Sequence, residues 1–293
     1  MAHSTVRAGV LDVAYERSGS GGWPVVLLHG FPYDVRSFDR VVPLLTAEGA
    51  DVVVPYLRGY GGTRFVDAGT MRSGQQAAVG HDLLELIDAL GLERPVVAGY
   101  DWGGRAACIV AALWPERVSG LVTGNGYMLQ DIAGSAGPLT PFMERKHWYQ
   151  SYLHGERGRA GLSEHRVEMA RLLWEEWSPT YEFTDDELAA TTASFDNPDF
   201  VDVCVHSYRH RYGLVGGDPA YDGTERLIAL QPTIDVPTIV LDGERDTVTP
   251  ARPRDSHEPH FSALVDHRLL DSGHDLPREV PDEFARAVLD LRP

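Results

Sequence analysis

Short apolar runs alternate with amphipathic stretches in the first part of the chain. The runs at 25–28, 52–54, 96–98 and 118–122 are bounded by turn residues, and each has the length of a buried strand. Apolar residues recur at every third or fourth position over 76–90 and 105–113, which predicts helices, and 6–15 predicts a hairpin. This alternation is typical of a mostly parallel sheet whose strands are joined by helices.

The pattern changes in the middle of the chain. Residues 133–226 carry many aromatic side chains among charged, helix-favouring segments, with no convincing buried strand. The earlier pattern then resumes, with strands predicted at 238–241 and 263–270 and a closing helix at 281–291. We therefore predict a core domain formed by 1–132 and 227–293, interrupted after its sixth strand by a helical cap domain over 133–226.

Composition and charge narrow the class of protein. The 293 residues are 43% hydrophobic and 24% charged, as expected for a soluble globular protein with a sizeable core. The 26 basic and 43 acidic side chains give a formal charge of -17, which repels nucleic acid and anionic membrane surfaces. We expect neither nucleic acid nor a membrane as a partner.

Cysteine and histidine usage argues against a disulfide framework or a metal site. Cys108 and Cys204 are the only cysteines, too few for a zinc site of cysteine type, and they fit a reduced, cytoplasmic location. The first residues do not resemble a signal peptide, and no run of about 18 apolar residues occurs. His206 and His210 have helical spacing but lack the glutamate of a zinc-protease motif, so we expect no metal.

The sharpest local motif lies between a predicted strand and a predicted helix. It reads Gly99-Tyr100-Asp101-Trp102-Gly103, the glycine spacing of a nucleophile elbow with aspartate in the central position. A strained turn of this kind presents the central side chain at the edge of the sheet, and small flanking residues let the backbone pack tightly. The alternative is a plain glycine-rich turn in which Asp101 caps the helix.

Further segments supply candidates for an oxyanion hole and for the acid and histidine of a catalytic triad. His29-Gly30-Phe31-Pro32 follows an earlier strand, where a backbone N–H of Phe31 can join that of Trp102 in an oxyanion hole. Asp246 and His274 each follow a late strand, and the order nucleophile, acid, histidine is that of the hydrolases with a nucleophile elbow.

These motifs together resemble the α/β-hydrolase superfamily, specifically its aspartate-nucleophile branch of epoxide hydrolases and haloalkane or haloacetate dehalogenases. The resemblance covers nearly the whole chain. It implies an α/β fold with a mostly parallel eight-stranded sheet, helices on both faces and an inserted helical cap. It also implies Asp101 as nucleophile, His274 as base and Asp246 as the acid that orients the base.

Several positions separate the subfamilies. Some dehalogenases carry the acid just after the sixth strand, where this chain has Asn125, so Asp246 is the better acid. Haloacetate dehalogenases hold the substrate carboxylate with two arginines, of which the resemblance matches only Arg105, because Trp102 occupies the other position. Without that pair, we expect a small anionic substrate to be disfavoured.

The predicted cap supplies the remaining chemistry by resemblance. Tyr208, followed by arginine, matches one of the two cap tyrosines with which epoxide hydrolases hydrogen-bond the ring oxygen, and Tyr149 is a candidate for the other. His147 and Trp148 compete for that second position, because they resemble the pair that holds halide in haloacetate dehalogenases. We place His29, Pro32, His147 and Trp148 among the substrate-binding residues.

The sequence therefore predicts a cofactor-independent epoxide hydrolase that uses a small-molecule epoxide and water, and it is compatible with a homodimer. One alternative is a dehalogenase with the same nucleophile and with Trp102 and Trp148 as halide contacts. A second is a non-catalytic ligand-binding protein that has kept the fold. The many aromatic residues of the cap suggest, as a hypothesis, a bulky or aryl epoxide.

Overall fold

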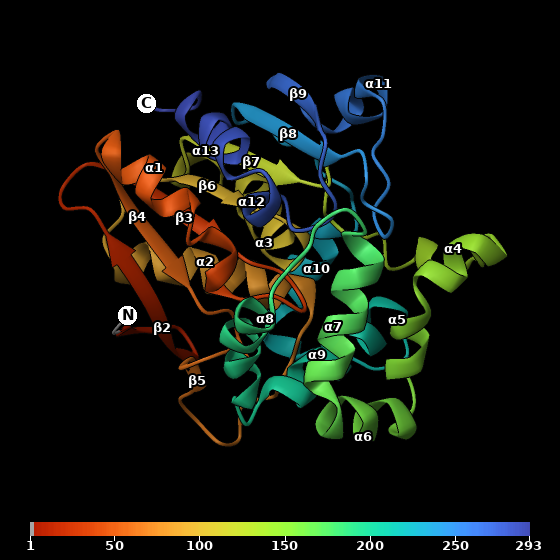
Figure 1. The fold of residues 1–293 in the computed structure, drawn as a ribbon. Helices are drawn as coiled ribbons and strands as arrows, with labels where there is room; N and C mark the ends of the chain where they lie inside the picture. The colour runs from red at the N-terminus through yellow and green to blue at the C-terminus, as the bar shows by residue number, and fades with distance from the viewer. Residues whose placement is uncertain (1–2) are drawn as a thin grey trace.

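A computed structural model describes residues 3–293, apart from the side chain of Ala136. The chain builds one sheet in the order β1-β2-β4-β3-β6-β7-β8-β9, and a short β5 pairs with β2 (Figure 1). The strands are β1 (Ser4–Ala8), β2 (Leu11–Ser18), β3 (Trp23–Leu28), β4 (Ala50–Pro55), β5 (Arg64–Phe65), β6 (Val96–Gly99), β7 (Gly120–Gly124), β8 (Thr238–Gly243) and β9 (Leu264–Leu270).

The predicted mostly parallel sheet is confirmed. Every pairing from β4 across to β9 is parallel, whereas β1 and β2 form an antiparallel hairpin. The central strands are buried along their length, as their continuous apolar runs require when helices cover both faces. The sheet has nine strands rather than the expected eight, because β5 is two residues long and leaves no apolar pattern to detect.

Helices flank the sheet in two groups. α1 (Val41–Ala47) packs against α13 (Pro281–Leu289), and α2 (Gln76–Ala89) packs against α3 (Asp101–Leu113). Figure 1 shows the two pairs on opposite sides of the strands. α3 begins four residues earlier than the predicted 105–113, because extended Tyr100 is its N-cap and the backbone N–H of Gly104 already donates to the carbonyl oxygen of Tyr100.

A helical insertion follows β7 and ends before β8. Its α-helices are α4 (Pro141–Lys146), α5 (Trp148–Leu153), α6 (Glu156–Glu164), α7 (Arg166–Trp177), α8 (Asp185–Thr192), α9 (Phe200–Arg211) and α10 (Asp222–Ile228). Figure 1 shows them gathered beside the sheet in green and cyan. The expected boundary between 226 and 227 falls inside α10. Across residues 3–293, no helix has the length and apolar character needed to cross a bilayer.

Candidate active site

Asp101 occupies a strained turn between β6 and α3. Its φ is +49°, in the left-handed region that residues other than glycine seldom adopt. The neighbouring chain is too close for side chains: a Cβ at Gly103 would lie 2.1 Å from the carbonyl oxygen of Leu28, and one at Gly30 would lie 2.5 Å from Cβ of Asp101. Gly103 of the predicted elbow and Gly30 of the loop after β3 are thus needed for the close approach of β3 and α3.

The carboxylate of Asp101 is held by one of the predicted oxyanion donors. The backbone N–H of Phe31 donates to its Oδ1 at 2.8 Å. Trp102 lies in the first turn of α3, where backbone N–H groups lack partners within the helix. Burial alone would raise the pKa of Asp101, but the imidazole of His274 and the Phe31 N–H outweigh burial and lower it.

His274 lies between two carboxylates. Its Nδ1 is 2.7 Å from Oδ2 of Asp246, and its Nε2 is 3.8 Å from Oδ2 of Asp101. Burial lowers the pKa of His274, but the charges of both carboxylates outweigh burial and raise it to about 10. The imidazole therefore carries a proton near neutral pH while Asp101 is ionised.

Asp246 is fixed by four donors. Its Oδ1 accepts the backbone N–H groups of Val248 and Thr249 at 2.9 and 2.8 Å. Its Oδ2 accepts from His274 and also from Nδ2 of Asn125, at 2.9 Å. Asn125, which follows β7, thus supports the carboxylate of Asp246, which follows β8. The sequence drew attention to Asn125 but did not predict its hydrogen bond to Asp246.

The backbone around His274 is clamped by a carboxylate that sequence reasoning missed. Glu279, in α12 (Leu276–Glu279), accepts the N–H of Gly273 at 2.6 Å, the N–H of Asp275 at 3.2 Å and the hydroxyl of Ser178 at 2.6 Å. Ser178 accepts the N–H of His274 in turn. The only sequence signal was a glutamate a few residues after the predicted base.

Aromatic rings pack around Phe31, Trp102 and His274. The ring of Tyr208 lies 5.4 Å from that of Phe31, 5.9 Å from that of Trp102 and 5.3 Å from that of Tyr149. Trp177, another residue that sequence reasoning did not single out, lies 5.0 Å from Tyr149 and 5.1 Å from His274. Within the described part of the chain, the buried indole N–H groups of Trp102 and Trp177 have no hydrogen-bond partner.

Tyr208 and Tyr149 are neutral donors in this setting. Burial raises the pKa of both hydroxyls above the usual range. The Tyr149 oxygen accepts from Nε2 of Gln150 at 2.8 Å, which leaves the Tyr149 proton free to be donated. The ring contact places Tyr149 beside Tyr208, and the role of Tyr149 as the second donor stays a prediction.

The other two candidates for that position each make a hydrogen bond within the protein. The indole N–H of Trp148 donates to Glu176 at 3.0 Å on an exposed part of the surface. Nε2 of His147 lies 3.1 Å from the carbonyl oxygen of Val248 and is hydrogen-bonded to it. These two nitrogen atoms already have partners, whereas Nδ1 of His147 is buried without one among the described residues, and substrate binding by Trp148 and His147 stays a prediction.

The polar atoms of His29 and Pro32, in the loop after β3, make hydrogen bonds within the protein. Nε2 of buried His29 accepts the N–H of Leu57 at 3.1 Å, and its Nδ1 bonds to the carbonyl oxygen of Gly30. Burial lowers the pKa of His29 to about 4, so the ring is neutral. The carbonyl oxygen of Pro32 accepts the indole N–H of Trp174 at 3.0 Å. Their polar atoms are thus already hydrogen-bonded, and the expectation that both residues contact substrate stays a prediction.

Arg105 is a buried cation four residues after Asp101. The residue is 4% exposed, and its Nε has no hydrogen-bond partner among the residues described. Burial and the nearby charge of Arg211 lower the pKa of Arg105 to about 10. Arg211 lies with its guanidinium carbon 4.9 Å from the ring centre of Tyr208. Arg211 is thus a second arginine near Arg105, and the sequence motifs did not indicate it.

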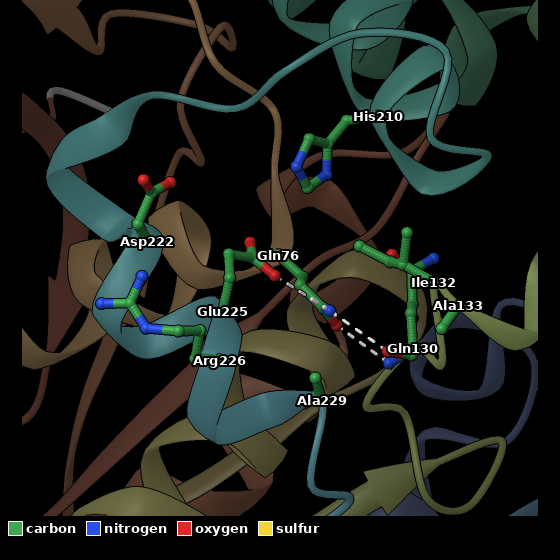
Figure 2. A pocket seen from close by; sticks show the side chains of 9 residues that line it. All are labelled: Gln76, Gln130, Ile132, Ala133, His210, Asp222, Glu225, Arg226 and Ala229. Carbon is green, nitrogen blue, oxygen red and sulfur yellow. Dashed lines mark hydrogen bonds between the residues drawn. The ribbon is translucent and has the colours of Figure 1, made fainter.

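A separate pocket lies where the insertion meets the start of α2. Figure 2 shows its lining, which comes from α2, from 130–133, from α9 and from α10, around a volume of about 340 Å³. Gln76 holds this wall together, since its amide donates to the carbonyl oxygen of Gln130 at 3.2 Å and to Glu225 at 3.3 Å. Asp101, His274 and the two tyrosines do not line this pocket.

Known proteins share this arrangement of the chain. The crystal structure of a Klebsiella pneumoniae subsp. pneumoniae protein, provisionally described as an epoxide hydrolase, matches with a TM-score of 0.96 and 42% identity, covering 99% of this chain and 97% of that one. Epoxide hydrolase B of Mycobacterium tuberculosis is 31% identical over 148 residues, 46% of this chain and 40% of that protein. Fluoroacetate dehalogenase of a Burkholderia species is 39% identical over 140 residues, 46% of this chain and 43% of that protein.

These curated relatives are matched over less than half of their own length. A family model described as the alpha/beta hydrolase fold matches residues 24–276, which is most of the chain. The predicted fold class and family are therefore confirmed: this chain belongs to the α/β-hydrolase family and is similar to epoxide hydrolases.

Proposed function

We propose that the protein is an epoxide hydrolase acting through a covalent ester on Asp101. The carboxylate attacks one oxirane carbon, the C–O bond breaks, and the electron pair moves to the departing oxygen. Tyr208 and Tyr149 hydrogen-bond that oxygen and supply the proton it needs. The insertion acts as the cap that brings these hydroxyls over the nucleophile and excludes water.

Hydrolysis of the ester then uses His274. Esterification removes the negative charge of Asp101, one of the two carboxylates that hold the pKa of His274 near 10. The imidazole can then give its proton to the tyrosinate that ring opening leaves behind and accept a new proton from a water molecule, while Asp246 keeps it oriented. The N–H groups of Phe31 and Trp102 stabilise the tetrahedral anion, and its collapse releases a vicinal diol.

The observation that carries this proposal is the placement of His274 between Asp246 and Asp101, together with two buried tyrosines that pack against Phe31, the residue whose N–H binds Asp101. Its test is a single turnover with a panel of aryl and alkyl epoxides in 18O-labelled water. If Asp101 attacks carbon, the first diol is unlabelled and the label appears in the carboxyl group of Asp101. Label in the first diol with none in Asp101 contradicts the covalent mechanism.

Dehalogenation by the same nucleophile is a second candidate, and specific observations favour it. The unpartnered indole N–H groups of Trp102 and Trp177 are donors of the kind that stabilise a departing halide. Arg105 and Arg211 offer two guanidinium groups to the carboxylate of a haloacid, which removes the earlier objection to a small anionic substrate. A halide assay with haloalkanes and haloacids, run beside the epoxide panel, separates the two activities.

A further inference from the structure

A second cluster of reactive side chains lies on the outer part of the sheet. Asp242 is in β8, His267 is in β9, and His257 ends α11 (Arg254–His257). In the parallel ladder His267 pairs with Val240, so His267 and Asp242 are near neighbours on one face of the sheet. α11 brings His257 to the same carboxylate.

Both imidazoles meet one carboxylate oxygen. Nε2 of His257 lies 2.9 Å from Oδ2 of Asp242, and Nε2 of His267 lies 3.2 Å from the same atom. The three ligand atoms all lie within 4.8 Å of one another. The side chains of His257, Asp242 and His267 are 0%, 2% and 5% exposed, so the cluster is buried.

We propose that Asp242, His257 and His267 form a binding site for a divalent transition metal, with Zn²⁺ as the ion that fits best. Two imidazoles and a carboxylate are the ligand types that zinc takes, at about 2.0–2.2 Å. Tetrahedral geometry at those lengths places neighbouring ligand atoms about 3.3 Å apart. The two nitrogen–oxygen separations, 2.9 and 3.2 Å, are close to that value, and the two imidazole nitrogens lie within 4.8 Å of each other, so small side-chain rotations would complete the site.

Protonation and nearby charge set the conditions for binding. A metal replaces the Nε2 protons that otherwise face Asp242, and each ring then carries its proton on Nδ1. The opposing charge is Arg252, whose backbone N–H donates to Asp242 at 3.2 Å and whose guanidinium donates to the carbonyl oxygen of Asn125. A water molecule is the fourth ligand that this set of three side chains calls for.

The position of the cluster indicates a structural role for the ion. Asp242 lies within β8, four residues before Asp246, which is on the loop that follows this strand. A metal bound there joins β8, β9 and α11, the elements that border the loop carrying Asp246. This inference is independent of the proposed reaction, because it concerns residues outside the reaction centre.

Metal content and thermal stability test the proposal directly. The full chain is stripped with a chelator, dialysed against Zn²⁺, and assayed for bound zinc and for Tm. We expect about one tightly held zinc per chain and, at a hundredfold excess over Kd, a rise in Tm of about 5 °C. Co²⁺ in place of Zn²⁺ is expected to give visible d–d absorption typical of low coordination number.

Variants assign the binding to these residues. Asp242→Asn and His267→Gln are expected to lose the bound zinc and the Co²⁺ absorption, with folding checked by circular dichroism. The matched control is His206→Gln with His210→Gln, a histidine pair on α9 whose rings stack at 5.6 Å, and it is expected to keep both signals. Wild-type protein that retains no zinc overturns the proposal, as does equal binding by wild type and the folded His267→Gln variant.

Discussion

The hydroxyl oxygen of Ser178 lies 3.0 Å from the backbone nitrogen of His274 and accepts its N–H. Ser178 follows the last residue of α7 in the insertion, whereas His274 follows β9 of the sheet. There is no room between the two segments, since a Cβ at Gly273 would lie 2.5 Å from Cα of Ser178. The position of the proposed base is therefore coupled directly to the position of the insertion.

This contact makes Glu279 and Ser178 positioning residues. The Glu279→Gln substitution replaces one carboxylate oxygen, which accepts hydrogen bonds, with an NH2 group, which donates them. This NH2 group would face backbone N–H groups that the carboxylate binds in the wild type, and two donors cannot form a hydrogen bond. We expect ester hydrolysis to slow roughly 10-fold, equivalent to about 1.4 kcal/mol, with ester formation little changed. Single-turnover kinetics measure both steps, and exposed Glu283→Gln is the control. Equal slowing of both steps, or none, contradicts the positioning role.

Asp101→Asn is expected to abolish turnover, because a neutral amide is a very poor nucleophile. The shape of the side chain is kept, so far-UV circular dichroism and Tm should show a folded protein. Full activity in freshly purified variant rules out Asp101 as the nucleophile.

His274→Gln should separate the two half-reactions. Alkylation of Asp101 requires no base, but hydrolysis of the ester does. Mass spectrometry after substrate exposure is expected to show protein heavier by the mass of one substrate. Steady turnover without an adduct would falsify the assignment of His274.

Tyr208→Phe distinguishes opening of an epoxide from release of a halide. An alkoxide needs a proton or a strong hydrogen bond, whereas a halide leaves as a stable anion. We expect epoxide alkylation to slow roughly 10- to 1000-fold, about 1.4 to 4 kcal/mol, with ester hydrolysis unchanged. Tyr152→Phe, in the same helix as Tyr149, is the control. If Tyr208→Phe and Tyr149→Phe both leave epoxide turnover intact while the wild type releases halide, dehalogenation replaces epoxide hydrolysis as the proposed function.

The charge of His274 predicts a pH dependence of stability. Its pKa is raised to about 10 in the folded protein, against about 6.5 for an unperturbed imidazole. The resulting stabilisation is complete below about pH 6.5 and is lost as pH rises towards 10. Urea unfolding of wild type and His274→Gln should therefore show a difference in the free energy of unfolding that shrinks over this interval. A difference that is flat or grows contradicts the raised pKa.

Local patterns in the sequence were sufficient to predict most strands and helices of the sheet domain and the sharp turn at Asp101. The apolar runs and helical periodicities placed β3, β4, β6, β8 and both α2 and α13 to within a few residues. The glycines around Asp101 marked the sharp turn, because backbone crowding there leaves no space for a Cβ. Asp246 and His274 were recognisable because chain order and the ends of strands fix which loops meet at the edge of a parallel sheet.

Tertiary structure decided which side chains meet and which are already engaged. Tyr149, Trp148 and His147 are consecutive in sequence order, yet only Tyr149 packs against Tyr208, because adjacent residues of a helix point in different directions. The clamp of Glu279 on Ser178 and the cluster around Asp242 join residues far apart in the chain, and no periodicity or motif encodes those distances. The sequence by itself therefore determined the fold and the reactive residue types. Only the packed chain determined their partners, since a hydrogen bond depends on positions set by every element packed around it.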